Sequence, residues 1–183
     1  VEKQVKTIQP PRLYDLTTLQ RECNRIYGYT AQQTLDYVQS LYEKKLATYP
    51  RTDSQYLTKD MQATAASLIL WLRDNMPFGK GCAGEPDIDR VTDDSKVTDH
   101  HAIIPTVEIA RTDLSELPSG ERDVLTLLVV RLLCATTQAH RFETVTAMLD
   151  CQGHTFTAKG KTILQSGWKE VERIHRSFLT GIG

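Results

Sequence analysis

Residues 46–57 read LATYPRTDSQYL, and they determine how the rest of this chain is interpreted. Pro50 fixes its own backbone angle and drives the residue before it toward extended geometry. We therefore expect Tyr49 at the end of a rigid, non-helical strand, with its side chain projecting outward. A phenol held in this way can act as a nucleophile.

The residues around the phenol suit chemistry on a phosphodiester. A tyrosine hydroxyl has a reference pKa of about 10, so its attack on phosphorus requires a nearby cation and help with the proton. Arg51 is the nearest positive charge in the sequence, and its planar guanidinium matches two phosphate oxygens at once. The alternative is a plain turn ahead of a helix capped by Asp53, Ser54 or Thr58, and spacing alone favours that alternative.

Two further blocks bear on this choice. Residues 16–22 read LTTLQRE, and residues 99–106 read DHHAIIPT. Together with residues 47–54, ATYPRTDS, they resemble the type IA DNA topoisomerases, most closely the topoisomerase III branch. Three matching blocks in the family's order are far more specific than one short motif. On these motifs the chain is identified as a member of that family, namely as a fragment containing the active-site tyrosine.

The resemblance implies roles for the residues of the tyrosine block. Tyr49 would attack single-stranded DNA and form a 5′-phosphotyrosine, and Arg51 would hold and neutralise the phosphate. The covalent link would keep the bond energy, so that the strand could be resealed without ATP. Thr52, Asp53 and Ser54 would shape the turn, and the hydroxyls of Thr52 and Ser54 would reach backbone phosphate.

The downstream block supplies a histidine. Taken alone, His100 and His101 suggest a structural hydrogen bond, or less strongly a metal ligand. The resemblance instead assigns His100 to a position beside the scissile phosphate, where an imidazole can donate a hydrogen bond or carry a proton. His101 is the less favoured participant. Ile104 stands where the other branch of the family has an arginine, which favours the topoisomerase III branch.

The family also requires Mg²⁺, which the resemblance places in an acidic cluster of a separate fold preceding this region, with a lysine near the scissile phosphate. Asp87 and Asp89 offer no substitute, since a solvated acidic loop is the simpler interpretation of their surroundings. We therefore expect no metal site in this chain. We also expect the chain alone to bind single-stranded DNA weakly and neither to cleave nor to relax it.

Composition sets looser limits. The 183 residues suffice for one medium domain with its own core, and a net charge of −1 argues against DNA binding by bulk electrostatics. The longest apolar run, residues 68–72, is far too short for a membrane span, and no signal peptide is visible, so we expect a cytoplasmic protein. The four cysteines lack zinc-ligand spacing and are expected to be reduced, with Cys23 and Cys134 in the core.

Hydrophobic periodicity predicts two helices before the tyrosine block. Thr17 and Gln20 have capping-box spacing for a helix that Gly28 closes. A second helix opens at Thr30 and is expected to run directly into residues 46–57. Its last turn would contain Lys44 and Lys45, either as solvated lysines that complement the helix dipole or in contact with DNA phosphate.

Later segments predict further helices and a hairpin. We expect a third helix over residues 59–73, a long acidic surface loop over residues 74–97, and a deeply buried helix from Pro118 onward. From Phe142 the apolar period becomes two, which predicts a β-hairpin centred on residues 150–153. A helix-like tail runs to Gly183.

The predicted fold class is α+β. A helical domain over residues 10–140 would carry the tyrosine, and residues 1–9 and 141–183 would be truncated parts of the β-rich arch that the resemblance implies. Two other classes stay open: a non-enzymatic helical module that binds nucleic acid or protein, and a tyrosine recombinase-like enzyme. The recombinase would need a second arginine and a His-x-x-Arg element, which His140 and Arg141 do not provide.

Overall fold

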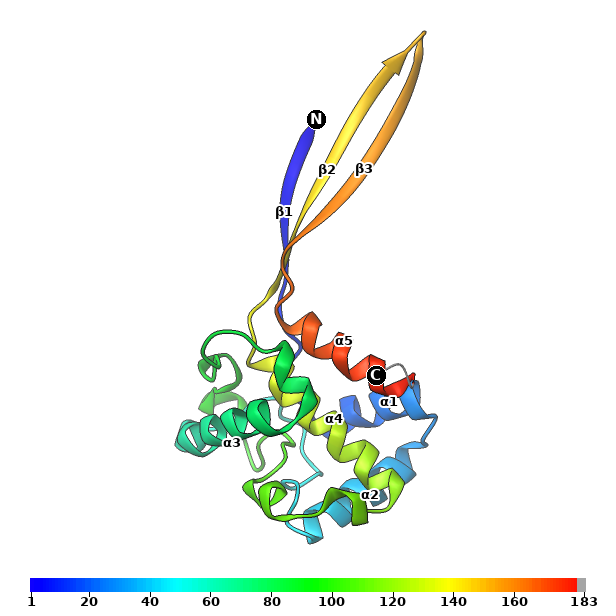
Figure 1. Cartoon of the computed structure of the whole chain (residues 1–183). Coiled ribbons are helices and arrows are strands. Elements are labelled where there is room, and N and C mark those ends of the chain that lie inside the picture. Colours follow the sequence, from blue (N-terminus) through cyan, green and yellow to red (C-terminus); the bar gives the residue numbers. More distant parts are fainter. Residues whose placement is uncertain (181–183) are drawn as a thin grey trace.

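The computed structural model describes residues 1–180 and confirms an α+β fold, with the helices gathered into one body and three strands projecting from it (Figure 1). The elements, in chain order, are β1 (Glu2–Ile8), α1 (Leu16–Tyr27), α2 (Ala31–Glu43), α3 (Gln62–Asn75), α4 (Ser119–Ala135), β2 (His140–Cys151), β3 (His154–Gln165) and α5 (Trp168–Leu179). Short 3₁₀ turns occupy much of the chain between α3 and α4. The expected helix-like tail is present as α5, and its last residues, 181–183, lie outside the described part.

The projecting ribbon is an antiparallel sheet with strand order β1-β2-β3. The hairpin turn lies between Cys151 and His154, and both of its central residues have positive φ, 52° at Gln152 and 82° at Gly153. Two consecutive positive φ angles give a turn whose twist matches the strands it joins. The hairpin prediction is confirmed, although β2 begins at His140, two residues before Phe142. Assignment of this ribbon to an arch domain stays a prediction.

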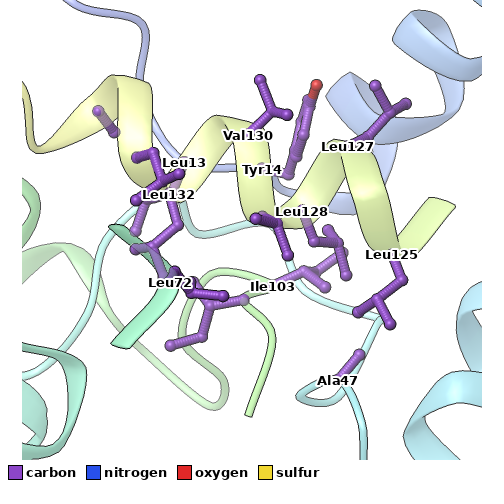
Figure 2. Close-up of a cluster of buried hydrophobic side chains, with 14 of the residues drawn as sticks. Leu13, Tyr14, Ala47, Leu72, Ile103, Leu125, Leu127, Leu128, Val130 and Leu132 are labelled. Carbon is purple, nitrogen blue, oxygen red and sulfur yellow. The ribbon is translucent and has the colours of Figure 1, made fainter. Parts of the chain in front are cut away.

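The core surrounds α4, which is buried on nearly every side as predicted. Figure 2 shows side chains of this helix meeting Tyr14, Leu72 and Ile103, which come from three widely separated parts of the sequence. Burying each large aliphatic side chain contributes about 1.5–3 kcal/mol, so α4 is the main source of cohesion in the helical body. Cys23 and Cys134 lie in this core, and burial raises the pKa of the Cys23 thiol to about 11.

The helix starts were predicted with mixed success. Thr30 caps α2 as expected, because its hydroxyl accepts a hydrogen bond from the main-chain N–H of Gln33 (3.1 Å) and the Gln33 side chain accepts one in return. Gly28 closes α1 with φ 74°. The capping box at Thr17 was wrong, since Asp15 is the N-cap and its carboxylate accepts from the N–H of Thr18 (2.7 Å).

The second helix does not run into the tyrosine block. It ends at Glu43, and the chain reverses through Lys45, which has φ 65°. Lys44 follows the last turn and donates to the buried carboxylate of Glu121 (2.6 Å), which also accepts from the Ser40 hydroxyl (3.0 Å). Lys44 is exposed, as the solvated interpretation expects, and its ion pair with Glu121 also ties α2 to α4. Contact with DNA stays a prediction.

The acidic segment 74–97 is better packed than predicted. Phe78 and Val91 are buried, and the Val91 carbonyl accepts from the N–H of Leu57 (2.7 Å). The N–H of Asp93 in turn donates to the Leu57 carbonyl (3.0 Å). The segment therefore supports the end of the tyrosine block. Among residues 1–180, no helix is both long and apolar enough to cross a lipid bilayer.

Candidate active site

The tyrosine and histidine blocks run side by side in opposite directions. The N–H of Thr48 donates to the Ile104 carbonyl (3.0 Å), and the N–H of Thr106 donates to the Leu46 carbonyl (3.0 Å). Ala47 pairs with a residue of the downstream block in an antiparallel bridge between these bonds. Segments more than fifty positions apart are thereby held in one register.

Thr48 adds a side-chain link between the two blocks. Its hydroxyl donates to the Ala102 carbonyl (3.2 Å) and accepts from the N–H of Ile104 (3.0 Å). Both of those residues are buried, and Thr48 itself is half-buried. Thr48 is a positioning residue that the sequence did not reveal, because nothing in the pattern distinguishes it from neighbouring small polar residues.

Tyr49 and His100 are brought together, as the resemblance implied. Their ring centroids lie 4.3 Å apart with an interplanar angle of 35°. The Tyr49 ring also meets Tyr42 from α2, edge to face, with ring centroids 5.3 Å apart. Pro50 is buried, whereas Tyr49 is half-buried and His100 is exposed. The phenol is therefore restrained by two rings while its surroundings stay open to solvent.

Arg51 lies on the exposed side of this segment. It lines an open pocket of about 400 Å³ together with Asp53, Asp99 and His100. Within residues 1–180, no carboxylate oxygen lies within 4.0 Å of the Arg51 side chain. Its guanidinium is therefore available to an anion that enters the pocket.

Thr52 and Ser54 have a different environment from the one expected of DNA ligands. Both are buried; the Thr52 hydroxyl donates to the His100 carbonyl (3.1 Å) and accepts from the N–H of Ser54 (3.1 Å). The Ser54 hydroxyl donates to the Lys96 carbonyl (2.8 Å). These bonds fix the path of the chain between the arginine and the histidine. Contact of either hydroxyl with DNA stays a prediction.

The first sequence block also reaches this pocket. The N–H of Leu16, the first residue of α1, donates to the Thr52 carbonyl (3.1 Å), and Thr17 lines the pocket. The N-terminus of α1 therefore lies at the pocket that Arg51 lines. All three blocks singled out from the sequence converge on one site.

The remaining candidates have structural surroundings. His101 is half-buried, with its Nδ1 2.8 Å from the Ala102 carbonyl oxygen, and Ile104 is part of the core. Across residues 1–180 no group of three or more His, Cys, Asp or Glu side chains is placed to hold a metal ion. These residues therefore do not fit a Mg²⁺ site, and no chemical step is assigned to a metal here.

Tyr49 lies against His100, and His100 lines an open pocket with Arg51, so a phenol, an imidazole and a guanidinium adjoin one another in a candidate active site. The family model described as DNA topoisomerase matches residues 1–178 of this chain. The chain belongs to the DNA topoisomerase family. It is 40% identical over 176 residues to "DNA topoisomerase 3" of Bacillus cereus and 38% identical over 177 residues to that of Bacillus subtilis, covering 93% of this chain in each case.

These relatives are much longer than the matched region, since the alignments cover 24% of each of them. Among solved structures, the chain resembles full-length topoisomerase I from Thermotoga maritima with a TM-score of 0.65 and 23% identity. That match covers 96% of this chain and 28% of the other. The similarity shows that the helical body and its strands share the fold of a segment of that enzyme.

Proposed function

We propose that this chain is the part of a type IA DNA topoisomerase, of the topoisomerase III branch, that breaks and rejoins single-stranded DNA. Tyr49 is the nucleophile, Arg51 holds the phosphate, and His100 donates a hydrogen bond to it. The observation that carries the proposal is that Tyr49 lies against His100, and that His100 lines one open pocket together with Arg51, within a chain that belongs to the topoisomerase family.

The chemistry is a reversible transesterification. The Tyr49 oxygen forms a bond to phosphorus and loses its proton, while the bond from phosphorus to the 3′ oxygen breaks and that oxygen takes up a proton. The products are a 5′-phosphotyrosine and a free 3′-hydroxyl. Because one ester replaces another, rejoining needs no ATP. Arg51 and His100 act on the negative charge that develops on the phosphoryl oxygens.

The fold supports this assignment through pre-organisation. Thr48 and Thr52 tie the tyrosine block to the histidine block through their hydroxyls. Groups held in place before the substrate arrives need little reorganisation during the reaction. Mg²⁺ is part of this proposal as a cofactor of the whole enzyme, bound by residues other than residues 1–180. A cytoplasmic location is also part of the proposal, because the chain belongs to a DNA topoisomerase family.

End-labelled DNA tests the proposal. The full-length protein is incubated with a single-stranded oligonucleotide labelled at either end, and the reaction is stopped with detergent. A 5′-phosphotyrosine leaves the 3′ label in the protein band and the 5′ label in the released fragment. The opposite pattern would indicate recombinase-type chemistry and contradict the proposal.

Two tyrosine variants identify the nucleophile. Tyr49→Phe should abolish the labelled protein band, because the attacking oxygen is gone. Tyr42→Phe is the matched control, since this neighbouring ring contacts Tyr49 and loses the same atom. It should keep the band. A labelled band that persists in Tyr49→Phe would refute the proposal. The absence of any labelled band with the wild-type protein would refute it as well.

A further inference from the structure

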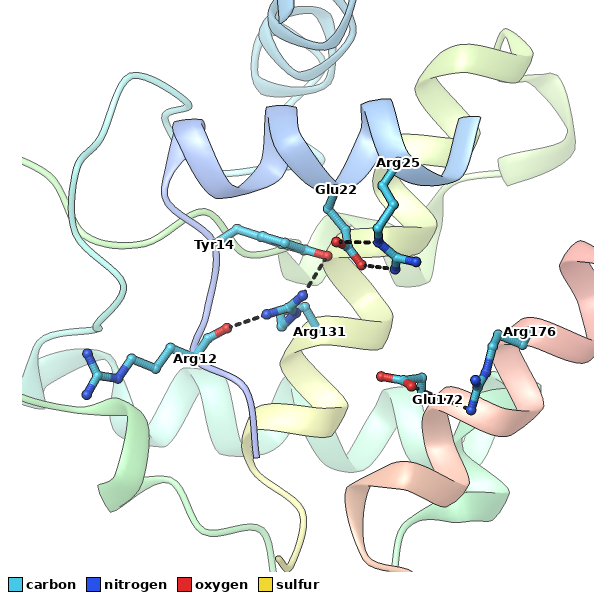
Figure 3. Close-up of polar contacts among 7 residues, drawn as sticks. All are labelled: Arg12, Tyr14, Glu22, Arg25, Arg131, Glu172 and Arg176. Carbon is cyan, nitrogen blue, oxygen red and sulfur yellow. Dashed lines mark hydrogen bonds and ion pairs between the residues drawn. The ribbon is translucent and has the colours of Figure 1, made fainter. Parts of the chain in front are cut away.

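One arginine of α4 holds a short segment that leads into the proposed active site. Arg131 donates from Nη1 to the Arg12 carbonyl (3.1 Å) and from Nη2 to the Tyr14 hydroxyl (3.2 Å), as Figure 3 shows. Its guanidinium carbon also lies 4.2 Å from the centroid of the Tyr14 ring. A guanidinium is planar and its donors have fixed directions, so these contacts fix the position of both residues relative to α4.

The guanidinium of Arg131 has no ion-pair partner that competes for it. Within residues 1–180, no carboxylate oxygen lies within 4.0 Å of this side chain. Two carboxylates line the same cavity of about 220 Å³, but Glu22 pairs with Arg25 (2.5 Å) and Glu172 pairs with Arg176 (3.5 Å). Both act on Arg131 only through longer-range electrostatics. Its directed contacts are therefore the two hydrogen bonds to the segment.

The same segment is bonded to both blocks of the site. The Tyr14 carbonyl accepts from the N–H of Ile103 (2.9 Å), and these two residues form an antiparallel bridge. Further along the chain, the N–H of Leu16 donates to the Thr52 carbonyl (3.1 Å). Ile103 belongs to the histidine block and Thr52 to the tyrosine block. Residues 12–16 therefore connect α4 to both blocks.

Thr52 connects this segment to two side chains of the pocket. It follows Arg51 directly in the sequence, and its hydroxyl donates to the His100 carbonyl (3.1 Å). Leu16 and Thr52 line the open pocket together with Arg51 and His100. A displacement of residues 12–16 would therefore change how the guanidinium and the imidazole are placed relative to each other.

Apolar packing does not replace the contacts of Arg131. Leu13 and Tyr14 are buried, and their burial holds the segment against the core. The hydrophobic effect has no direction, whereas a hydrogen bond weakens steeply as its angle departs from linear. Burial therefore stabilises the segment, and the hydrogen bonds from Arg131 determine its orientation.

We propose that Arg131 is a positioning residue of the cleavage reaction. It acts through residues 12–16, which set the places of Arg51 and His100 at the pocket. This inference rests on the proposed function, because that function gives those two side chains their roles. It gives α4, the centre of the core, a part in the geometry of the reaction.

The rate of adduct formation separates positioning from stability. The full-length protein is mixed with a saturating end-labelled single-stranded oligonucleotide, and the adduct is quantified after quenching with detergent at successive times. A loss of folded protein lowers the amount of adduct but leaves the first-order rate constant unchanged. R131M should lower that rate constant on the order of 10- to 100-fold, since a misplacement of about 1 Å can cost about 100-fold. The oligonucleotide concentration that gives half the maximal rate constant should stay at the wild-type value.

Two arginine variants serve as controls. R176M removes a guanidinium that lines the same cavity and pairs with Glu172 instead of the segment, and it should keep the wild-type rate constant. R131K keeps the charge, but one ammonium does not reproduce the fixed fork that bonds two acceptors. The rate constant of R131K should therefore fall between those of R131M and the wild type.

A double variant tests the route through Tyr14. Tyr14→Phe removes only the hydroxyl that accepts from Arg131, and it should lower the rate constant less than R131M does. In the R131M background this hydroxyl has already lost its donor, so adding Tyr14→Phe should cause no further fall.

The inference is overturned if R131M and R176M have the same rate constant. It is also overturned if R131M changes only the half-saturating concentration, or if the effects of R131M and Tyr14→Phe multiply in the double variant. Should R131M not fold, wild-type rate constants for both R131K and Tyr14→Phe would overturn it. Failure of the proposed function would be seen differently, as an adduct that survives Tyr49→Phe.

Discussion

Thr48→Val tests whether one hydroxyl holds the two halves of the site together. Valine has nearly the shape of threonine but cannot form hydrogen bonds through its side chain. The N–H of Ile104 would lose its acceptor at 3.0 Å, and the Ala102 carbonyl would lose a donor at 3.2 Å. Ile104 is only 4% exposed, so its N–H depends on an acceptor within the protein.

The magnitude follows from these two groups. A buried N–H without a partner costs about 1–3 kcal/mol. The Ala102 carbonyl is less affected, because His101 Nδ1 lies 2.8 Å from it, so the second loss is the net value of one hydrogen bond, about 0.5–1.5 kcal/mol. The sum is about 1.5–4.5 kcal/mol. For a domain of this size that lowers Tm by about 3–18 °C.

Thermal unfolding followed by circular dichroism gives the answer, with Thr48→Ser as the matched control. Serine keeps the hydroxyl and loses one methyl group, so its free energy of unfolding should fall by about 1 kcal/mol or less. In the full-length protein, Thr48→Val should also reduce the adduct at Tyr49, and Thr48→Ser should preserve it. Equal melting temperatures for the two variants would refute the assigned role of the hydroxyl.

Two further predictions concern the frame of the fold. Gly167 has φ 57°, and a Cβ there would lie 2.3 Å from the carbonyl oxygens of Gln138 and Ala139, so Gly167→Ala should cost about 2 kcal/mol or more by chemical denaturation. Gly153→Ala, with φ 82° and open space, is the control and should cost less. Burial lowers the pKa of His175 from its ordinary 6.5, so the unfolded chain binds this proton at a higher pH than the folded chain. The contribution of His175 to the free energy of unfolding is therefore complete above about pH 6.5, where the imidazole is neutral in both states. It is lost as the pH falls from about 6.5 toward the lowered pKa of the folded state. His175→Phe should therefore flatten the fall in Tm between about pH 7.5 and pH 5, and an unchanged slope would contradict this assignment.

Local signals in the sequence predicted some helix ends and missed another. Thr30 begins α2 and Gly28 ends α1 as expected, because capping depends on residues only a few positions away, whereas Asp15 rather than Thr17 caps α1. Lys44 could not be predicted, because its partner Glu121 is 77 positions further along the chain. Segment 74–97 looked like a solvated loop because its few apolar residues have no regular period.

The site itself could be predicted only in part. Pro50 indicated a rigid tyrosine. The proximity of His100 to Tyr49 was implied only by the resemblance to a family, because the positions of two residues in a sequence do not reveal how far apart they lie in the fold. Thr48 escaped notice because the pairing it supports belongs to isolated bridges with no strand periodicity. Thr52 was expected to contact DNA, yet it is buried and bonded to the main chain.

The central claim is that Tyr49 becomes covalently joined to the DNA it cuts. The most direct measurement is mass spectrometry of the trapped adduct, after the full-length protein has been digested with a protease and the DNA trimmed with a nuclease. The account predicts a single modified peptide, with a 5′-linked nucleotide on Tyr49. A nucleotide on any other residue, Tyr42 included, would contradict it.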